Sequence, residues 1–251
     1  MNIIGINDYL GSSEHLEALG EVIDDGDYDV FVFPGGITKG EKHREEMLSA
    51  EREGREPEKN KEELDLERKN KKREMENFLN FLIDIEIPTL LIPGRNDIPF
   101  RMYQLVLEEF EDYPFIHPLH LKFVKLGGLI FSGCGGKIGD RNQDFFELEV
   151  YKEDMMQRMT NLRTFSQEKI LLFHNPPVYP GTEEPEEGSP YVNQIIQLVN
   201  PKIVFYGMID PASGMKIIDD TVAINPGPFN EGNYVEVNTT TMKVDFKNLE
   251  E

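Results

Sequence analysis

The 251-residue sequence has a single cysteine, few cations and no long apolar run. With only Cys134, an internal disulfide and a zinc site built from several cysteines are both excluded. Because no run of 18 apolar residues is present, the sequence predicts no membrane-spanning helix. The first residues, MNIIGINDYLGSS, become polar too soon for a signal peptide, and we expect a cytoplasmic protein.

Cations are scarce relative to anions. The chain has 26 Lys and Arg against 47 Asp and Glu, for a formal charge of -21. A field of this sign repels nucleic-acid phosphates and anionic membranes, so we expect neither as a partner. It also opposes binding of a highly anionic substrate unless a local cation offsets it.

The stretch Pro88–Pro99, PTLLIPGRNDIP, ends an aliphatic run in a Pro-Gly pair and then presents polar side chains. Those side chains are Arg95, Asn96, Asp97 and Arg101. A buried strand that stops at a glycine before polar groups is how open α/β sheets build sites. The pattern recurs at Phe31–Gly36, Leu171–Pro177 and Val204–Asp210, so we expect four strand ends to contribute to one site.

The remaining patterns predict the fold. Apolar runs at 2–6 and 28–33 flank a stretch of helical spacing, which predicts a βαβ unit with parallel strands. A hairpin is expected around Gly127-Gly128, and helices over 103–110 and 154–165. We expect a single α/β domain over residues 1–251, with two mixed β-sheets packed face to face and flanked by helices.

A charged helical insertion interrupts this pattern at about 41–83. Residues 41–76 contain 11 Lys and Arg and 13 Asp and Glu. Pro57 separates two helical pieces, at about 41–53 and 59–83, and only the end of the second is amphipathic. Two interpretations stay open: a solvated hairpin laced by ion pairs, and an arm that contacts a partner or a second copy.

Six strand-end motifs follow one another in a recognisable order. They are Ile6–Gly11 (INDYLG), Phe33–Thr38 (FPGGIT), Ile92–Asp97 (IPGRND), Leu172–Pro177 (LFHNPP), Tyr206–Asp210 (YGMID) and Asp220–Gly227 (DTVAINPG). Together with the glycine segment 133–136, they resemble the calcineurin-like metallophosphoesterase superfamily, with signatures D-x-H, G-D, G-N-H-D/E, a single H and G-H-x-H. The resemblance covers nearly the whole chain and points to a prokaryotic or archaeal phosphoesterase subfamily. It implies a four-layer sandwich in which two metal ions activate a hydroxide and hold a phosphate ester.

The same resemblance shows that several metal positions carry a different residue here. Leu10 replaces a ligand histidine, and Gly36 replaces the bridging aspartate. Arg95 replaces a ligand asparagine, and Asn96 replaces the histidine that acts on the leaving group. Met208 replaces a histidine of G-H-x-H. The donors that remain are Asp8, His174 and Asp210, the last in place of a histidine. With Asn96 at the position of the catalytic histidine, we expect no catalytic residue.

Two dications need bridging anions to offset their repulsion, and this chain has Gly36 in place of the bridge and a cation at Arg95. A guanidinium stays protonated and offers a bidentate fork to phosphate or carboxylate. We therefore expect no cofactor, with one divalent metal (Mn, Fe, Zn or Mg) on Asp8, His174 and Asp210 as the alternative. The candidate contacts to a small anionic ligand are Arg95, Asn96, Asn7 and Asn175.

These replacements leave two functions open. In the first, the protein has lost the dinuclear metal site and has a non-catalytic binding, sensor or scaffold role. Its partner is then a small anion, another protein or a second copy in a homo-oligomer. In the second, it is a metal-dependent phosphodiesterase or phosphatase with an altered or mononuclear site, in which Arg95 holds the phosphate.

Purely structural roles are the alternative for several of these candidate site residues. Arg95 would pair with Asp8 or Asp97, Asp97 would cap the following helix, and His174 would bond to Asp8 or Asp210. The histidines without metal spacing are predicted to be surface or packing residues: His15, His43, His117 and His120.

Overall fold

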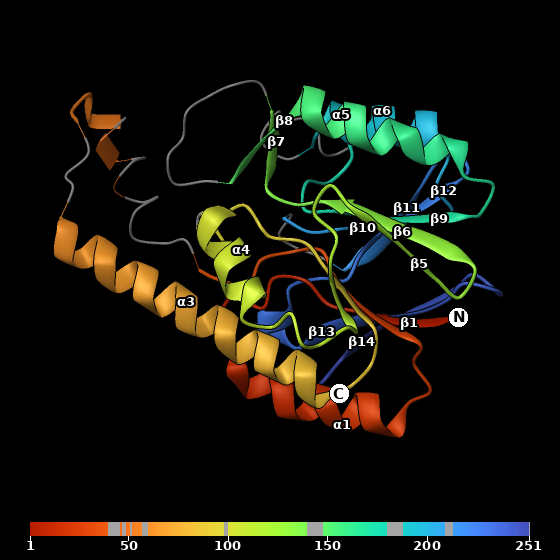
Figure 1. The fold of residues 1–251 in the computed structure, drawn as a ribbon, viewed down its shortest axis with the longest axis horizontal. Coiled ribbons are helices and arrows are strands. Elements are labelled where there is room, and N and C mark those ends of the chain that lie inside the picture. Colours follow the sequence, from red (N-terminus) through yellow and green to blue (C-terminus); the bar gives the residue numbers. More distant parts are fainter. Residues whose placement is uncertain are drawn as a thin grey trace.

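The computed structural model describes residues 1–39, 46, 49–50, 52–56, 60–97, 100–139, 148–179, 188–208 and 213–250. Two six-stranded sheets lie face to face, with helices on both outer faces (Figure 1). This arrangement confirms the predicted sandwich of two mixed sheets flanked by helices.

The first sheet has the strand order β14-β13-β1-β2-β3-β4. Its strands are β1 (Asn2–Gly5), β2 (Val30–Phe33), β3 (Thr89–Leu91), β4 (Ile116–Pro118), β13 (Asn233–Asn238) and β14 (Lys243–Asn248). Strands β1 to β4 are parallel, and β13 runs antiparallel to both β1 and β14. Helix α1 (Leu16–Asp25) connects β1 to β2, so the predicted βαβ unit is present.

The second sheet has the order β11-β12-β10-β9-β6-β5. Its strands are β5 (Phe123–Leu126), β6 (Leu129–Cys134), β9 (Lys169–Phe173), β10 (Ile203–Tyr206), β11 (Gly214–Ile218) and β12 (Thr221–Asn225). The four inner strands are parallel, and β5 and β11 are antiparallel edges. The β5–β6 pair is the predicted hairpin, and β7 (Lys137–Gly139) pairs with β8 (Glu149–Tyr151) outside both sheets.

Helices close both outer faces. On the first sheet, α3 (Lys61–Asp84) and α4 (Phe100–Glu108) join α1, and on the second lie α5 (Lys152–Thr160) and α6 (Pro190–Val199). Short 3-10 turns cover Ser13–His15, Asn161–Thr164 and Phe229–Glu231. The helix predicted at 103–110 starts and ends earlier, and the one predicted at 154–165 ends in one of these turns. None of the helices within the described ranges has the length and apolar character that a membrane crossing requires.

The inner strands are apolar throughout because both of their faces are buried. In β2, Val30 and Val32 face the opposite sheet, whereas Phe31 and Phe33 face the helices. The same alternation in β9 and β10 produces three apolar layers, one between the sheets and one under each helical layer.

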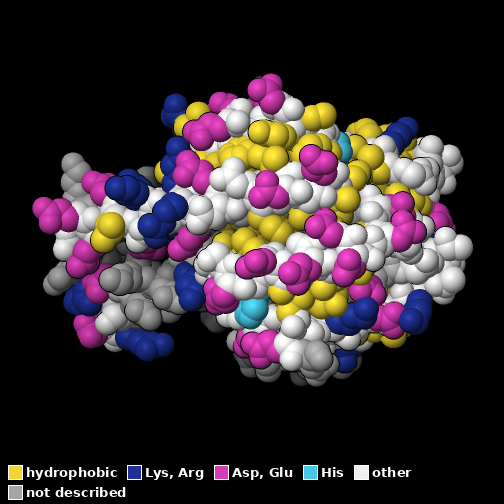
Figure 2. Space-filling model, turned by 90° about the horizontal axis from the view of Figure 1, so that it is seen from below, with side chains coloured by type: hydrophobic (Ala, Val, Ile, Leu, Met, Phe, Trp, Pro, Cys, Tyr) yellow, Lys and Arg dark blue, Asp and Glu magenta, His cyan; other side chains and the backbone are white. Residues whose placement is uncertain are grey.

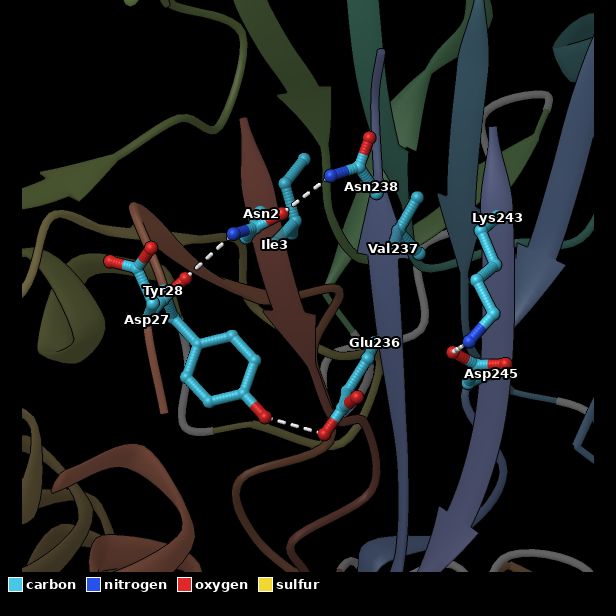
Figure 3. A pocket seen from close by; sticks show the side chains of 9 residues that line it. All are labelled: Asn2, Ile3, Asp27, Tyr28, Glu236, Val237, Asn238, Lys243 and Asp245. Atoms are coloured by element: carbon cyan, nitrogen blue, oxygen red, sulfur yellow. Dashed lines mark hydrogen bonds and ion pairs between the residues drawn. The ribbon is translucent and has the colours of Figure 1, made fainter. Parts of the chain in front are cut away.

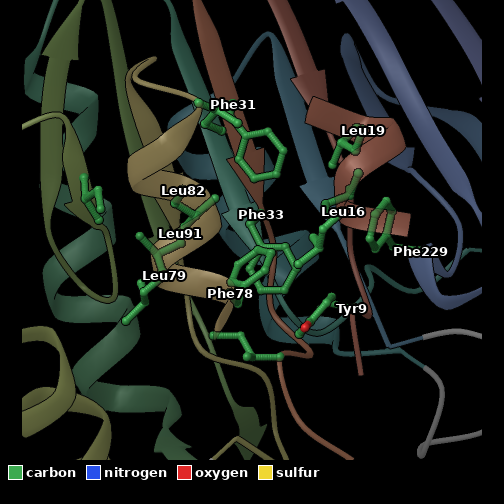
Figure 4. Close-up of a cluster of buried hydrophobic side chains, with 14 of the residues drawn as sticks. Tyr9, Leu16, Leu19, Phe31, Phe33, Phe78, Leu79, Leu82, Leu91 and Phe229 are labelled. Carbon is green, nitrogen blue, oxygen red and sulfur yellow. The ribbon is translucent and has the colours of Figure 1, made fainter. Parts of the chain in front are cut away.

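The last part of the charged insertion is a core element. In α3, Met75, Phe78, Leu79 and Leu82 are fully buried, and the Phe78 ring stacks on Tyr9 with centroids 4.9 Å apart (Figure 4). The first part of α3 extends beyond the sheet, where Lys and Arg side chains mix with Asp and Glu (Figure 2). The solvated interpretation therefore fits only that outer part, and the helix predicted at 41–53 lies mostly outside the described residues.

Candidate functional site

The carboxyl ends of the parallel strands of both sheets meet at one edge of the sandwich. His174, after β9 in the second sheet, donates from Nδ1 to the carbonyl of Pro34, after β2 in the first, at 3.1 Å. Gly136, after β6, donates its N–H to the carbonyl of Pro93, after β3, at 2.9 Å. The loops that carry the sequence motifs are therefore in contact across the two sheets.

The loop after β1 is held in an unusual backbone conformation. Asp8 and Leu10 have φ values of 53° and 49°, in the left-handed region that non-glycine residues rarely adopt. Backbone N–H groups of Asp8 and Leu10 donate to the carbonyls of Gly35 and Gly36 at 3.1 and 3.0 Å. Strain of this kind concentrates at functional sites, where the surrounding structure holds it.

Asn7 is fully buried beside Asp8. Its Nδ2 donates to Asp8 Oδ2 at 2.7 Å, while its Oδ1 is buried and has no hydrogen-bond partner within the described part of the chain. The orientation of the amide follows from the carboxylate, because the reverse orientation would place two acceptors together. Asn7 thus offers a buried acceptor at the site.

Gly36, which the resemblance assigns to the position of a bridging aspartate, has φ +90° and lies against the Asp8 carboxylate. A Cβ at position 36 would overlap Asp8 Oδ1 and lie 2.9 Å from Asp8 Cα. The Asp8 carboxylate therefore occupies the space into which a side chain at position 36 would extend.

Arg95 lies on a turn, Gly94 to Asp97, that is tightly held. Asp97 is 2% exposed; its Oδ1 accepts from Thr38 N at 2.9 Å and its Oδ2 from Gly94 N at 2.5 Å. Asp97 therefore clamps this turn to the loop after β2, while its predicted role as a cap for the following helix involves residues 98–99, which lie outside the described residues. Burial raises the pKa of Asp97, and the two N–H donors and the charge of Lys71 oppose this shift.

His174 is uncharged at neutral pH. Burial, with a smaller contribution from the charge of Arg95, lowers its pKa to about 4. Since Pro34 offers only a carbonyl, the proton is on Nδ1 and the lone pair on Nε2. The partner of His174 Nδ1 is therefore a backbone carbonyl and not one of the predicted carboxylates.

The other predicted residues have separate positions. Asn175 accepts from Ile138 N at 2.6 Å and donates to Met208 Sδ at 3.3 Å, so it links the loops after β9 and β10. The backbone carbonyl of Asn96 accepts two bonds, from Thr38 Oγ1 and from Lys71 Nζ. Asp210 lies outside the described residues.

Two side chains make contacts that the sequence did not indicate. Lys71 looked like part of a solvated ion-pair pattern with Glu67, and nothing local indicated its contact with Asn96. His120, predicted to be a surface or packing residue, accepts from Gly135 N at 3.1 Å, and burial lowers its pKa to about 4. Cys134 is buried, which raises its pKa and leaves no thiolate.

Three positions that the resemblance assigns to metal ligands carry other side chains here. Leu10 and Gly36 supply no donor, and Arg95 adds a fixed cation. Within the described ranges, no group of three or more His, Cys, Asp and Glu side chains is placed to hold a metal ion.

A pocket of about 280 Å³ lies at the opposite ends of the strands, around the start of β1 (Figure 3). Most of its polar side chains pair with one another: Tyr28 with Glu236, Asn238 with Asn2, and Lys243 with Asp245. Because these groups satisfy one another, the strand-end site is the stronger candidate for function.

An α/β/β/α sandwich with polar loops at the carboxyl ends of its parallel strands is the architecture of metallophosphoesterases. The family model described as metallophosphoesterase, calcineurin superfamily, matches residues 1–249, and the chain belongs to this family.

Solved structures support the fold. One crystal structure, 24% identical, matches 99% of this chain and 98% of its own with a TM-score of 0.86. TT1561 of Thermus thermophilus is 20% identical over 99% of this chain and 98% of its own, with a TM-score of 0.79. GAP50, the anchor in the inner membrane complex of Plasmodium, is 11% identical over 99% and 88% of the two chains, with a TM-score of 0.52. None of the curated proteins matches the chain.

Proposed function

We propose that this metallophosphoesterase-family protein binds a small anion at its strand-end site, in a binding, sensor or scaffold role, without the two-metal hydrolysis of the family. The observation that carries the proposal is Arg95. Arg95 is only 9% exposed. It lies on a clamped turn, at the position that the resemblance assigns to a metal ligand. A buried cation beside a neutral histidine favours a phosphate or carboxylate and disfavours dications.

The environment of Gly36 supports the same conclusion. Two metal ions in this family share the carboxylate at that position, and here the space is taken by Asp8. GAP50, the anchor in the inner membrane complex of Plasmodium, has this fold.

One observation favours a second candidate, a phosphodiesterase or phosphatase with a single metal. Asn7 Oδ1 is a buried acceptor without a partner in the described residues, next to Asp8, and His174 has its lone pair on Nε2. Asn7 Oδ1, Asp8, His174 Nε2 and Asp210 would together hold one divalent ion. Such an ion would lower the pKa of a bound water. Arg95 would then orient the phosphate.

Metal content and anion binding separate the two. We would dialyse the protein against Mn²⁺, remove free metal, and measure bound metal by elemental analysis and turnover of bis-p-nitrophenyl phosphate. Binding of inorganic phosphate would be measured by calorimetry for the wild type, Arg95→Met and the matched control Arg101→Met, since Arg101 is exposed on α4. The first proposal expects no turnover and at least about tenfold weaker phosphate binding in Arg95→Met only, because charge-assisted hydrogen bonds are lost.

Other outcomes would overturn it. Two equivalents of Mn²⁺ with turnover that His174→Ala abolishes would restore the family's reaction. One equivalent with turnover would establish the mononuclear candidate. A wild type that binds no phosphate would remove anion binding at Arg95.

A further inference from the structure

The turn that carries Arg95 is held from several directions. The carbonyl of Arg95 accepts from Leu148 N at 2.9 Å, and Asp97 clamps Gly94 and Thr38. The carbonyl of Asn96, directly after Arg95, accepts from Thr38 Oγ1 at 3.0 Å and from Lys71 Nζ at 2.9 Å. Of these partners, Lys71 is the one that comes from the charged insertion.

Lys71 lies on the face of α3 that is turned toward the strand-end loops. Glu67, Lys71 and Glu74 are spaced by four and three residues and so share a helical face. Lys71 Nζ lies 3.5 Å from Glu67 Oε1, and the carboxyl carbon of Glu74 would lie 2.9 Å from a Cβ at Gly11. The helix therefore contacts both the loop after β1 and the turn after β3.

Lys71 also differs from its neighbour Lys72. The side chain of Lys71 is 12% exposed and donates to the turn, whereas that of Lys72 is 40% exposed and pairs with Glu76 and Glu109. Burying an ammonium is costly unless it makes specific bonds, so the contact with Asn96 is a defined feature of the fold.

We propose that Lys71 is a positioning residue for Arg95, and that the insertion helix α3 is thereby a part of the strand-end site. Lys71 holds the carbonyl that follows Arg95, keeps the turn in the conformation that Asp97 clamps, and so directs the guanidinium toward its anion. The expected effect on anion binding rests on the proposed function, but the effect on the turn does not.

The test compares Lys71→Met with Lys71→Arg and with the matched control Lys72→Met. Amide hydrogen exchange is measured at Gly94 and Thr38, whose N–H groups donate to Asp97, and phosphate binding is measured by calorimetry. We expect exchange at both amides to be at least about tenfold faster in Lys71→Met and phosphate binding to weaken about tenfold. Lys71→Arg restores both, because arginine donates to the same carbonyl, and Lys72→Met changes neither.

Unchanged exchange at Gly94 and Thr38 in folded Lys71→Met would refute the positioning role. Should Lys71→Met not fold, Lys71→Gln is measured in its place under the same criterion. If the wild type binds no phosphate, the proposed function fails, while the exchange data still decide the role of Lys71.

Discussion

Gly94→Ala would test how closely the two loops at the centre of the site approach each other. A Cβ at position 94 would overlap the backbone nitrogen of Gly36 and lie 2.9 Å from Gly36 Cα and 3.1 Å from Asp97 Oδ2. Two of these three neighbours are backbone atoms, so a rotamer change cannot relieve the overlap. The methyl group must push the turn after β3 away from the loop after β2.

The cost follows from this geometry. Overpacking typically costs about 1–3 kcal/mol, and a clash with backbone belongs at the upper end. Separation of the loops also weakens a bond from Gly94 or Thr38 to Asp97, and a hydrogen bond to a charged group contributes about 1.5–3 kcal/mol. We expect a loss of about 3–5 kcal/mol in the free energy of unfolding, or a melting temperature roughly 10 °C lower for a chain of this size.

Chemical denaturation followed by circular dichroism measures the change. Gly214→Ala is the matched control, because a Cβ at this strand position would meet nothing within 4 Å. It should shift stability by no more than about 1 kcal/mol, in the stabilising direction. If Gly94→Ala and Gly214→Ala unfold within about 1 kcal/mol of each other, the close approach of the two loops is refuted.

Two further predictions concern α3 and His120. Phe78→Ala should cost about 3–5 kcal/mol in the free energy of unfolding, because the ring is buried against Tyr9 and Phe33. The control Leu66→Ala should cost less than about 0.5 kcal/mol, because Leu66 is 58% exposed. Similar losses for both variants would place the inner part of α3 outside the core. The pKa of His120 is about 4 in the folded protein and about 6.5 in the unfolded chain. The stability that its neutral form contributes is therefore fully present above pH 6.5. As the pH falls toward 4, up to about 3 kcal/mol of this stability is lost. His120→Asn keeps an acceptor for Gly135 N and should reduce the pH dependence of unfolding by about one proton; an unchanged slope would contradict the burial of a neutral imidazole.

Much of the architecture was predictable from local patterns. Apolar runs that end at Gly or Pro indicated the buried parallel strands, because a strand buried on both faces has no polar alternation. The helical spacing between β1 and β2 predicted the βαβ unit, and Gly127-Gly128 predicted the hairpin. Helix bounds were less accurate, as for α4 and α5, since helix ends depend on contacts outside the helix. The order of the strand-end motifs was sufficient to identify the family.

The relations within the site came from the tertiary structure. That Gly36 and Arg95 replace metal ligands of the family is a prediction from the residue types alone. That the Asp8 carboxylate fills the space at Gly36, or that Asp97 clamps Thr38, depends on residues many positions apart in the chain. The same is true of Lys71, whose charge pattern indicates a solvated helix while its contact with Asn96 places it at the site. Local sequence sets which segments form strands and helices, whereas the packing of distant loops decides which side chains meet.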